Sequence, residues 1–350
     1  MKNIAFDRSS AKITGRNYSK NNILYLLHSG SGAEFDFFGK EMFITVGCDT
    51  DSLSGGRVCN YPRIAVLVDG RPIVRKVVFK ERGRYKVICT DEASEHRVSI
   101  IKLSEAAFSI ALLYEAETDD DAVMTPTEEK KLKIEFIGDS ITCGFGVDDN
   151  NVEGEFSTAA ENFMKSYAYL TARKLDADYS VFSYSGYGLI SGYTADGVRN
   201  TDEILPQYYE SLGYSHCSAE GVRMQELSWD FSCFRPDIIV INLGTNDNSF
   251  CIKNEGAFDE LEKEYLRFIG TVRKNSPQAK IICAIGLIDV ETFESVKKAA
   301  ESFGGENVYT FFFRPQDGLL GYGAQWHPSE DTHSYAADEL SDFIRSIVSE

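Results

Sequence analysis

The sequence has little of several features that mark other classes of protein. No stretch approaches the roughly 20 apolar residues that span a bilayer, and the amino terminus lacks the apolar core and cleavage site of a secretion signal. The eight cysteines form no Cys-x-x-Cys pair, and none stands at a metal-finger spacing from the five histidines. We therefore expect reduced thiols, no metal, no organic cofactor and a cytoplasmic location, or a secreted protein if a signal was trimmed away.

Positive charge is also scarce. The chain has 36 Lys and Arg against 54 Asp and Glu, a formal net charge of −18 at pH 7. Such a surface repels phosphate backbones and anionic lipid headgroups, so we expect no nucleic acid and no membrane among its partners. The remaining composition is ordinary for a globular protein, 43% hydrophobic and 12% aromatic, and 350 residues suggest two domains. The sequence does not indicate an oligomeric state.

Residues 1–118 predict an antiparallel β-sandwich. Short apolar segments alternate there with turn sequences such as SGSG and DGRP, and helical periodicity is nearly absent. The expected strands are residues 23–27, 33–38, 42–46, 64–68, 73–79, 85–88, 97–103 and 108–114. Residues 119–131 are acidic and then basic, which indicates a solvated linker.

Residues 132–350 predict a doubly wound α/β domain, because strand and helix patterns alternate there. The nearly continuous apolar run at 238–243 is typical of a central parallel strand. The other expected strands are residues 132–138, 179–183, 280–285 and 307–313, and the expected helices are 166–174, 258–274, 292–302 and 334–349.

Polar motifs follow three of these strands, at the sheet edge where such folds bind ligands. They are Gly-Asp-Ser at 138–140, SYSGYG at 183–188 and GTND at 244–247, and a late loop, GYGAQWHP, carries a histidine. A serine hydroxyl needs a base within hydrogen-bond reach, which His327 would provide for Ser140. The backbone N–H groups of Ser140 and Gly188 and the side-chain amide of Asn246 would stabilise a tetrahedral oxyanion. These parts together predict acyl transfer.

Each motif alone has an ordinary structural explanation. A Gly-Asp-Ser tripeptide often marks only a turn, Asn246 and Asp247 are common at helix caps, and a His-Pro pair is common in surface loops. Their occurrence after three successive predicted strands favours the catalytic interpretation. The Gly-x-Ser-x-Gly elbow of the α/β hydrolases is absent, which disfavours that family.

The blocks IGDSIT, SGYG, INLGTND and WHP resemble, in this order, the four sequence blocks of the SGNH (GDSL-type) hydrolases. The segments ITGRNY, HSGSGAEFDF and RIAVLVDG resemble the jelly-roll domain of carbohydrate esterase family 2. The resemblance covers nearly the whole chain. It implies a jelly roll followed by an SGNH domain, and a serine esterase that removes O-acetyl groups from xylan or glucomannan, including 6-O positions. By resemblance, Ser140 is the nucleophile, Gly188 and Asn246 complete the oxyanion hole, and His327 is the base.

One position departs from the family pattern. Most SGNH hydrolases have an aspartate three residues before the histidine, where this sequence has Ala324. Glu330 stands three residues before His333 and offers a second acid–histidine pair, but the His-Pro block favours His327. We expect His327 Nδ1 to donate to a main-chain carbonyl of its own loop, since the ring needs an acceptor that fixes its tautomer rather than a full charge.

Three residues are weaker candidates for substrate binding: Trp326, Tyr187 and Asp139. Trp326 would either stack on a sugar ring or pack under its loop, and Tyr187 would either line the pocket or belong to the core. The expected substrate is an acetylated xylo-, manno- or glucomanno-oligosaccharide. The alternatives are an SGNH lipase or thioesterase acting on short acyl esters, and a non-catalytic carbohydrate-binding protein that uses the sandwich. The sequence does not distinguish the polysaccharide or the acetyl position.

Overall fold

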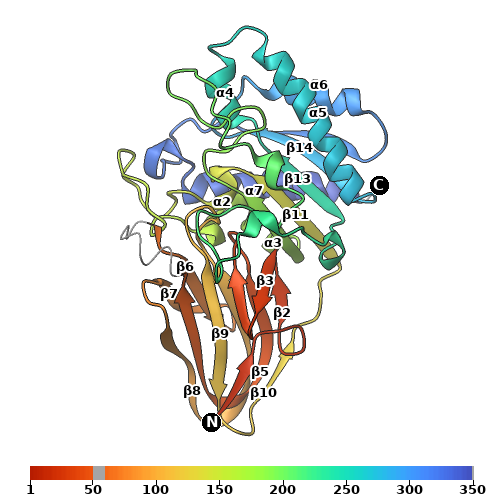
Figure 1. Cartoon of the computed structure of the whole chain (residues 1–350). Coiled ribbons are helices and arrows are strands. Elements are labelled where there is room, and N and C mark those ends of the chain that lie inside the picture. The colour runs from red at the N-terminus through yellow and green to blue at the C-terminus, as the bar shows by residue number, and fades with distance from the viewer. Residues whose placement is uncertain (50–59, 349–350) are drawn as a thin grey trace. The chain divides into compact units, whose positions relative to one another are not determined.

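The computed structural model describes residues 1–49 and 60–348, and the chain divides into two compact units (Figure 1). The first unit comprises residues 1–129, 156–161 and 211–229, and the second comprises residues 130–155, 162–210 and 230–350. Residues 156–161 and 211–229 therefore belong to the first unit, whereas the predicted boundaries at 118 and 132 place them in the second. Hydrogen bonds hold them there: Arg63 donates to Glu161 O at 2.6 Å, and Arg16 donates to Ser211 O at 2.8 Å.

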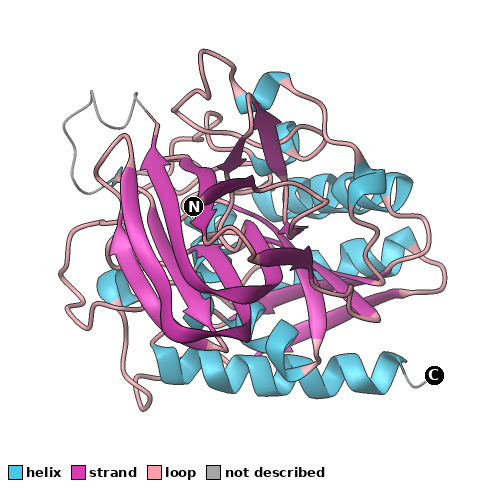
Figure 2. Ribbon diagram, turned by 90° about the horizontal axis from the view of Figure 1, so that it is seen from below, coloured by secondary structure: helices cyan, strands magenta, loops and turns pink. Residues whose placement is uncertain are grey.

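The first unit is built on one ten-stranded antiparallel sheet, which confirms the predicted antiparallel fold. Figure 2 shows its strands curling in space. The strands are β1 (Lys2–Ala5), β2 (Lys12–Thr14), β3 (Asn17–Lys20), β4 (Ile23–Leu26), β5 (Gly32–Cys48), β6 (Arg63–Val68), β7 (Arg71–Val77), β8 (Gly83–Lys102), β9 (Ala111–Thr118) and β10 (Val123–Pro126).

Two long strands explain how the sheet curls. β5 joins the predicted strands 33–38 and 42–46, and β8 joins 85–88 and 97–103, because irregularities after Gly39 and Met42 bend the pair without ending it. β10 pairs antiparallel with β5, so the predicted linker contributes a strand to this sheet. The acidic and basic residues around it gave no sign of this pairing, because four residues are too few for a strand pattern.

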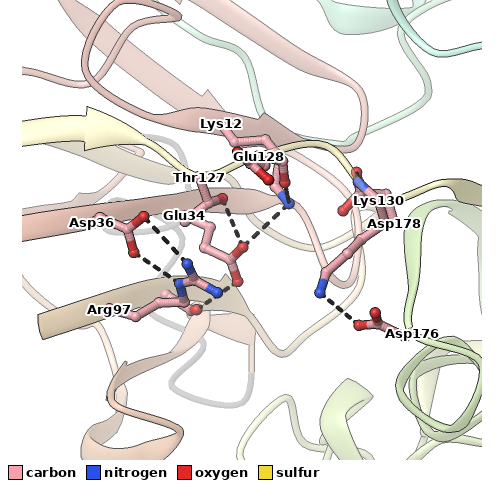
Figure 3. A network of polar contacts seen from close by, with 10 residues as sticks. Lys12, Glu34, Asp36, Arg97, Thr127, Glu128, Lys130, Asp176 and Asp178 are labelled. Atoms are coloured by element: carbon pink, nitrogen blue, oxygen red, sulfur yellow. Dashed lines mark hydrogen bonds and ion pairs between the residues drawn. The ribbon is translucent and has the colours of Figure 1, made fainter.

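The two faces of β5 show why this segment forms a half-buried strand. Phe35 and Phe37 point into the core, with 0% and 1% of their surfaces exposed. Figure 3 shows the alternate residues on the other face, where Asp36 accepts two hydrogen bonds from Arg97 at 2.9 and 3.2 Å. Glu34, next along this face, accepts hydrogen bonds from Ser99 of β8 at 3.0 Å and from Thr127, just after β10, at 2.8 Å. The period of two therefore separates an apolar face from a polar one.

The second unit contains a five-stranded parallel sheet with strand order β12-β11-β13-β14-β15, as expected for a doubly wound domain. Its strands are β11 (Leu132–Gly138), β12 (Ala177–Ser183), β13 (Ile238–Asn242), β14 (Lys280–Gly286) and β15 (Val308–Phe313). Its α-helices are α2 (Ser140–Cys143), α3 (Tyr167–Lys174), α4 (Thr245–Cys251), α5 (Ala257–Asn275), α6 (Phe293–Phe303) and α7 (Glu330–Val348). α3 packs against α7, and α5 packs against α6.

The direction of strand addition reverses beside β11. The chain places β12 on one side of β11 and β13 on the other. Right-handed crossovers then put α3 on the opposite face of the sheet from α5 and α6. Such a reversal opens a crevice outside the carboxyl ends of the two central strands, which is where doubly wound folds bind ligands. Ser140 follows β11 at this point, and Asn246 follows β13.

Candidate active site

A tight turn at the end of β11 presents Ser140. Asp139 caps α2, its Oδ1 accepting a hydrogen bond from the Ile141 N–H at 3.0 Å. Gly138 makes room for this turn, because a Cβ there would lie 2.1 Å from Thr142 Oγ1. Ser140 is the first residue of the helix and is 6% exposed, and its backbone N–H has no acceptor within residues 1–49 and 60–348. The Ser140 N–H is thus left for a ligand.

His327 lies within hydrogen-bond distance of this serine. Its Nε2 is 2.9 Å from Ser140 Oγ, and its ring packs against Phe145 with the centroids 4.2 Å apart. Burial lowers the pKa of the imidazole to about 4, so the ring is neutral at physiological pH. A neutral ring with its proton on Nδ1 leaves the Nε2 lone pair to accept the serine proton, as a general base requires.

Main-chain carbonyls, rather than a carboxylate, orient the histidine. Nδ1 is 3.1 Å from Gln325 O and 3.2 Å from Ala324 O, and no carboxylate of the described residues is hydrogen-bonded to it. Gln325 and Trp326 have φ of +51° and +59°, a left-handed turn that folds the carbonyls back toward the ring. Non-glycine residues adopt this conformation at a cost, so its presence here points to a functional constraint.

The second histidine of this region, His333, has a structural position. It is fully buried in α7, and its Nδ1 accepts a hydrogen bond from the Tyr167 N–H at 3.1 Å. Burial lowers its pKa to about 3. Glu330, its possible acid partner in the sequence, pairs instead with Lys165 at 2.5 Å. The geometry therefore favours His327 as the base.

Asn246 lies in the first turn of α4, with its side-chain amide directed at the loop that follows β12. Its Nδ2 donates to Tyr187 O at 2.9 Å. Because an amide nitrogen carries two protons, the second remains for an oxyanion. This geometry fits the predicted role of Asn246.

Gly188 does not fit the predicted role of oxyanion donor, because its N–H donates to Glu203 O at 3.1 Å. Close packing, rather than an oxyanion, requires glycine at position 188, because a Cβ would lie 2.1 Å from Ser191 O and 2.7 Å from Asp247 Oδ2. Gly186, with φ of +83°, has an N–H without an acceptor in the described part of the chain. Both glycines lie in the SGYG block, so the block alone does not distinguish them.

The three weaker candidates have different environments. Trp326 is 53% exposed and contacts Tyr322 edge to face at 5.1 Å, so its ring is accessible to a sugar. Tyr187 is 4% exposed and packs against Tyr184 with centroids 5.0 Å apart, which places it in the core. Asp139 is fully buried, so the predicted contact with substrate does not fit, and its carboxylate shapes the turn instead.

The described residues contain neither a metal-ligand cluster nor a membrane-spanning helix. No three His, Cys, Asp or Glu side chains among them are grouped as they would be around a metal ion. None of their helices is both long enough and apolar enough to cross a bilayer.

The sequence is similar to those of known proteins. The chain is 33% identical over 327 residues to the cellulase/esterase CelE of Acetivibrio thermocellus, and covers 37% of that protein's length. It is 29% identical to an acetylxylan esterase / glucomannan deacetylase of Cellvibrio japonicus over 81% of this chain and 76% of that one. The match to CelE covers 91% of this chain but only 37% of CelE, so this chain spans little more than a third of that protein.

The structure is also similar to solved structures of known proteins. A family two carbohydrate esterase from Clostridium thermocellum, in complex with cellohexaose, is 28% identical with a TM-score of 0.83, covering 97% of this chain and 99% of that one. The acetyl xylan esterase Est2A from the rumen bacterium Butyrivibrio proteoclasticus is 23% identical with a TM-score of 0.87 and full coverage of both chains, which shows the shared fold. Residues 136–348 match the GDSL-like lipase/acylhydrolase family, and the chain belongs to that family.

Proposed function

We propose that this chain is a serine esterase that removes O-acetyl groups from plant-derived oligosaccharides. The observation that carries the proposal is the 2.9 Å contact between His327 Nε2 and Ser140 Oγ at the carboxyl end of a parallel sheet. The relatives named as acetylxylan esterases, glucomannan deacetylases and family two carbohydrate esterases support acetylated xylo-, manno- or glucomanno-oligosaccharides as the substrate class.

The first half of the reaction forms an acyl-enzyme. Ser140 Oγ attacks the acetyl carbonyl carbon while His327 Nε2 takes the hydroxyl proton. The carbonyl oxygen becomes an oxyanion, for which the Ser140 N–H and the second proton of Asn246 Nδ2 are available donors. The Gly186 N–H, which has no acceptor in the described part of the chain, is the candidate for a third donor. Collapse of this intermediate breaks the bond to the sugar oxygen, which leaves with the proton from His327.

The second half regenerates the enzyme. His327, neutral again, takes a proton from a water molecule as the water attacks the acetyl-serine. The same donors stabilise the second oxyanion, and collapse releases acetic acid and returns the proton to Ser140. Because Nδ1 stays bonded to main-chain carbonyls throughout, the ring keeps the tautomer that each step needs.

The proposal is tested by acetate release from acetylated xylan and glucomannan oligosaccharides, with products mapped by NMR. We expect the wild-type chain to release acetate and to cleave acetyl esters much faster than octanoyl esters. Comparable rates on the two esters would favour a lipase or thioesterase. Binding of the oligosaccharides without release of acetate would favour a carbohydrate-binding protein.

A further inference from the structure

The carboxylate of Asp247 is fully buried behind the loop that follows β12, and its neighbours there are backbone N–H groups. Oδ1 accepts hydrogen bonds from Leu189 N at 2.9 Å, Ile190 N at 2.7 Å and Ser191 N at 3.1 Å, and Oδ2 lies 3.0 Å from Leu189 N. Three consecutive N–H groups thus converge on one side chain. These bonds hold the loop backbone firmly, because hydrogen bonds to a charged acceptor are roughly twice as strong as neutral ones.

We propose that Asp247 is a positioning residue of the esterase reaction, holding residues 186–191 so that the oxyanion donors of two strand ends keep their geometry. This inference rests on the proposed function. Asp247 follows Asn246 directly, and the Asn246 amide binds Tyr187 O at 2.9 Å in the same loop. The two adjacent side chains therefore tie the carboxyl end of β12 to that of β13.

Gly188 supplies a second, independent sign of this contact. A Cβ at this position would lie 2.7 Å from Asp247 Oδ2 and 2.8 Å from Asp247 Cγ. The loop backbone thus approaches the carboxylate more closely than any other residue type permits. Gly186, two residues earlier, carries the N–H that lacks an acceptor within the described ranges. A shift of the loop at Gly188 would therefore displace that N–H.

Burial of the carboxylate has an electrostatic cost that the N–H groups offset. Burial raises the pKa of Asp247 to about 6, and the hydrogen bonds from Ile190, Leu189 and Ser191 act in the opposite direction. An asparagine has the same shape, but it is neutral and accepts through one oxygen only. Its NH2 group would face the Leu189 N–H, which lies 3.0 Å from Oδ2. Asp247→Asn is therefore the variant that disturbs the loop with the least change in volume.

The matched control is Asp289→Asn. Asp289 is also a buried carboxyl in the second unit, 3% exposed, but it accepts from Thr292 Oγ1 and Glu291 N in the loop after β14. For both variants, active sites are counted by completed phosphonylation with a fluorophosphonate, and kcat and KM for p-nitrophenyl acetate are expressed per active site.

We expect Asp247→Asn to lower kcat by about 10- to 100-fold, below the 10²–10³ typical of deleting an oxyanion donor outright, with KM within about twofold because ground-state binding is unchanged. Asp289→Asn should keep the wild-type kcat. If Asp247→Asn does not fold, Asp247→Ser takes its place, with the same expected loss in kcat and the same limit on the change in KM. A wild-type kcat in the Asp247 variant, an equal loss in both variants, or a rise in KM alone overturns the inference. An inactive wild-type chain would instead refute the proposed function.

Discussion

The imidazole Nε2 of His327 lies 2.9 Å from Ser140 Oγ, although 187 positions separate the two residues in the sequence. The fold brings them together by two local devices. A capped turn at the end of β11 presents the serine, and a left-handed turn at residues 325–326 brings main-chain carbonyls to the other ring nitrogen. The result is a nucleophile–base pair in which main-chain carbonyls orient the histidine.

Removing the nucleophile should abolish turnover and leave the fold intact. In Ser140→Ala we expect less than about 10⁻³ of the wild-type kcat on p-nitrophenyl acetate, because only the hydroxyl makes the covalent bond. The thermal midpoint should change little, since the variant keeps the Cβ and the backbone. Enzyme kinetics and a thermal melt of the same preparation check both parts. Substantial residual turnover would rule out the serine mechanism.

Substitutions at the two histidines, His327 and His333, should have different effects on activity. His327→Ala should lose as much activity as Ser140→Ala, because nucleophile and base act as a unit. His333→Asn should keep most activity per folded molecule, since an asparagine oxygen can still accept the hydrogen bond from the Tyr167 N–H. The reverse pattern, with His327 dispensable and His333 essential, would contradict the assignment of the base.

The acids at the start of α7 should be dispensable. Glu330→Gln and Asp331→Asn are expected to keep kcat within about threefold, because the acceptors of His327 Nδ1 are carbonyls. Loss of an orienting acid typically costs about 10⁴ in kcat. Steady-state kinetics of the two variants therefore decide the question by a wide margin. A loss approaching that figure in either variant would show that a carboxylate reaches the ring.

The base should stay neutral well into the acid range. Burial lowers the pKa of His327 to about 4, against an ordinary value near 6.5, because the charged ring is poorly solvated there. Protonation as pH falls through this pKa would remove the lone pair that accepts the serine proton. NMR titration of the histidine C–H signals, with His327→Ala for the assignment, is expected to show a midpoint near 4. A midpoint near 6.5 would contradict this environment.

Two glycines should respond to alanine in opposite ways. Gly188→Ala should lower both stability and kcat, because its Cβ would lie 2.1 Å from Ser191 O. Gly270→Ala, in the middle of α5 with 4.0 Å to the nearest atom, should stabilise the fold by about 1 kcal/mol. Urea unfolding and kcat of both variants give the comparison. A well-folded, fully active Gly188→Ala chain would refute the close packing of this loop.

The sequence predicts strands best where the pattern is long and local. The strand at 132–138 has the predicted bounds, and the other parallel strands agree to within about two residues, because buried apolar runs specify them. β5 and β8 were each predicted as two strands, since a bulge interrupts the alternation of side chains without interrupting the ladder. Strand β10 was missed because it is short and polar.

Some residues of the candidate site could be predicted from local sequence, and others depend on tertiary contacts. Ser140, His327 and Asn246 could be found because their chemistry requires those residue types after those strands. The choice between Gly186 and Gly188 could not be made, since it depends on which N–H the Glu203 carbonyl accepts. The burial of Asp139 and the bonds of Asp247 to a loop 56 to 58 residues away also depend on tertiary contacts. The GTND block contains Asp247, but in the sequence an aspartate at this position is equally typical of a helix cap.

The central claim, that the Ser140–His327 pair is the catalytic machinery, is tested most directly by mapping the site of phosphonylation. The chain is treated with a fluorophosphonate, digested and sequenced by mass spectrometry, with esterase activity followed in parallel. We expect one adduct per chain, on Ser140, with loss of activity in proportion to labelling and no labelling in His327→Ala. An adduct on another residue, or full activity after stoichiometric labelling of Ser140, would contradict the account.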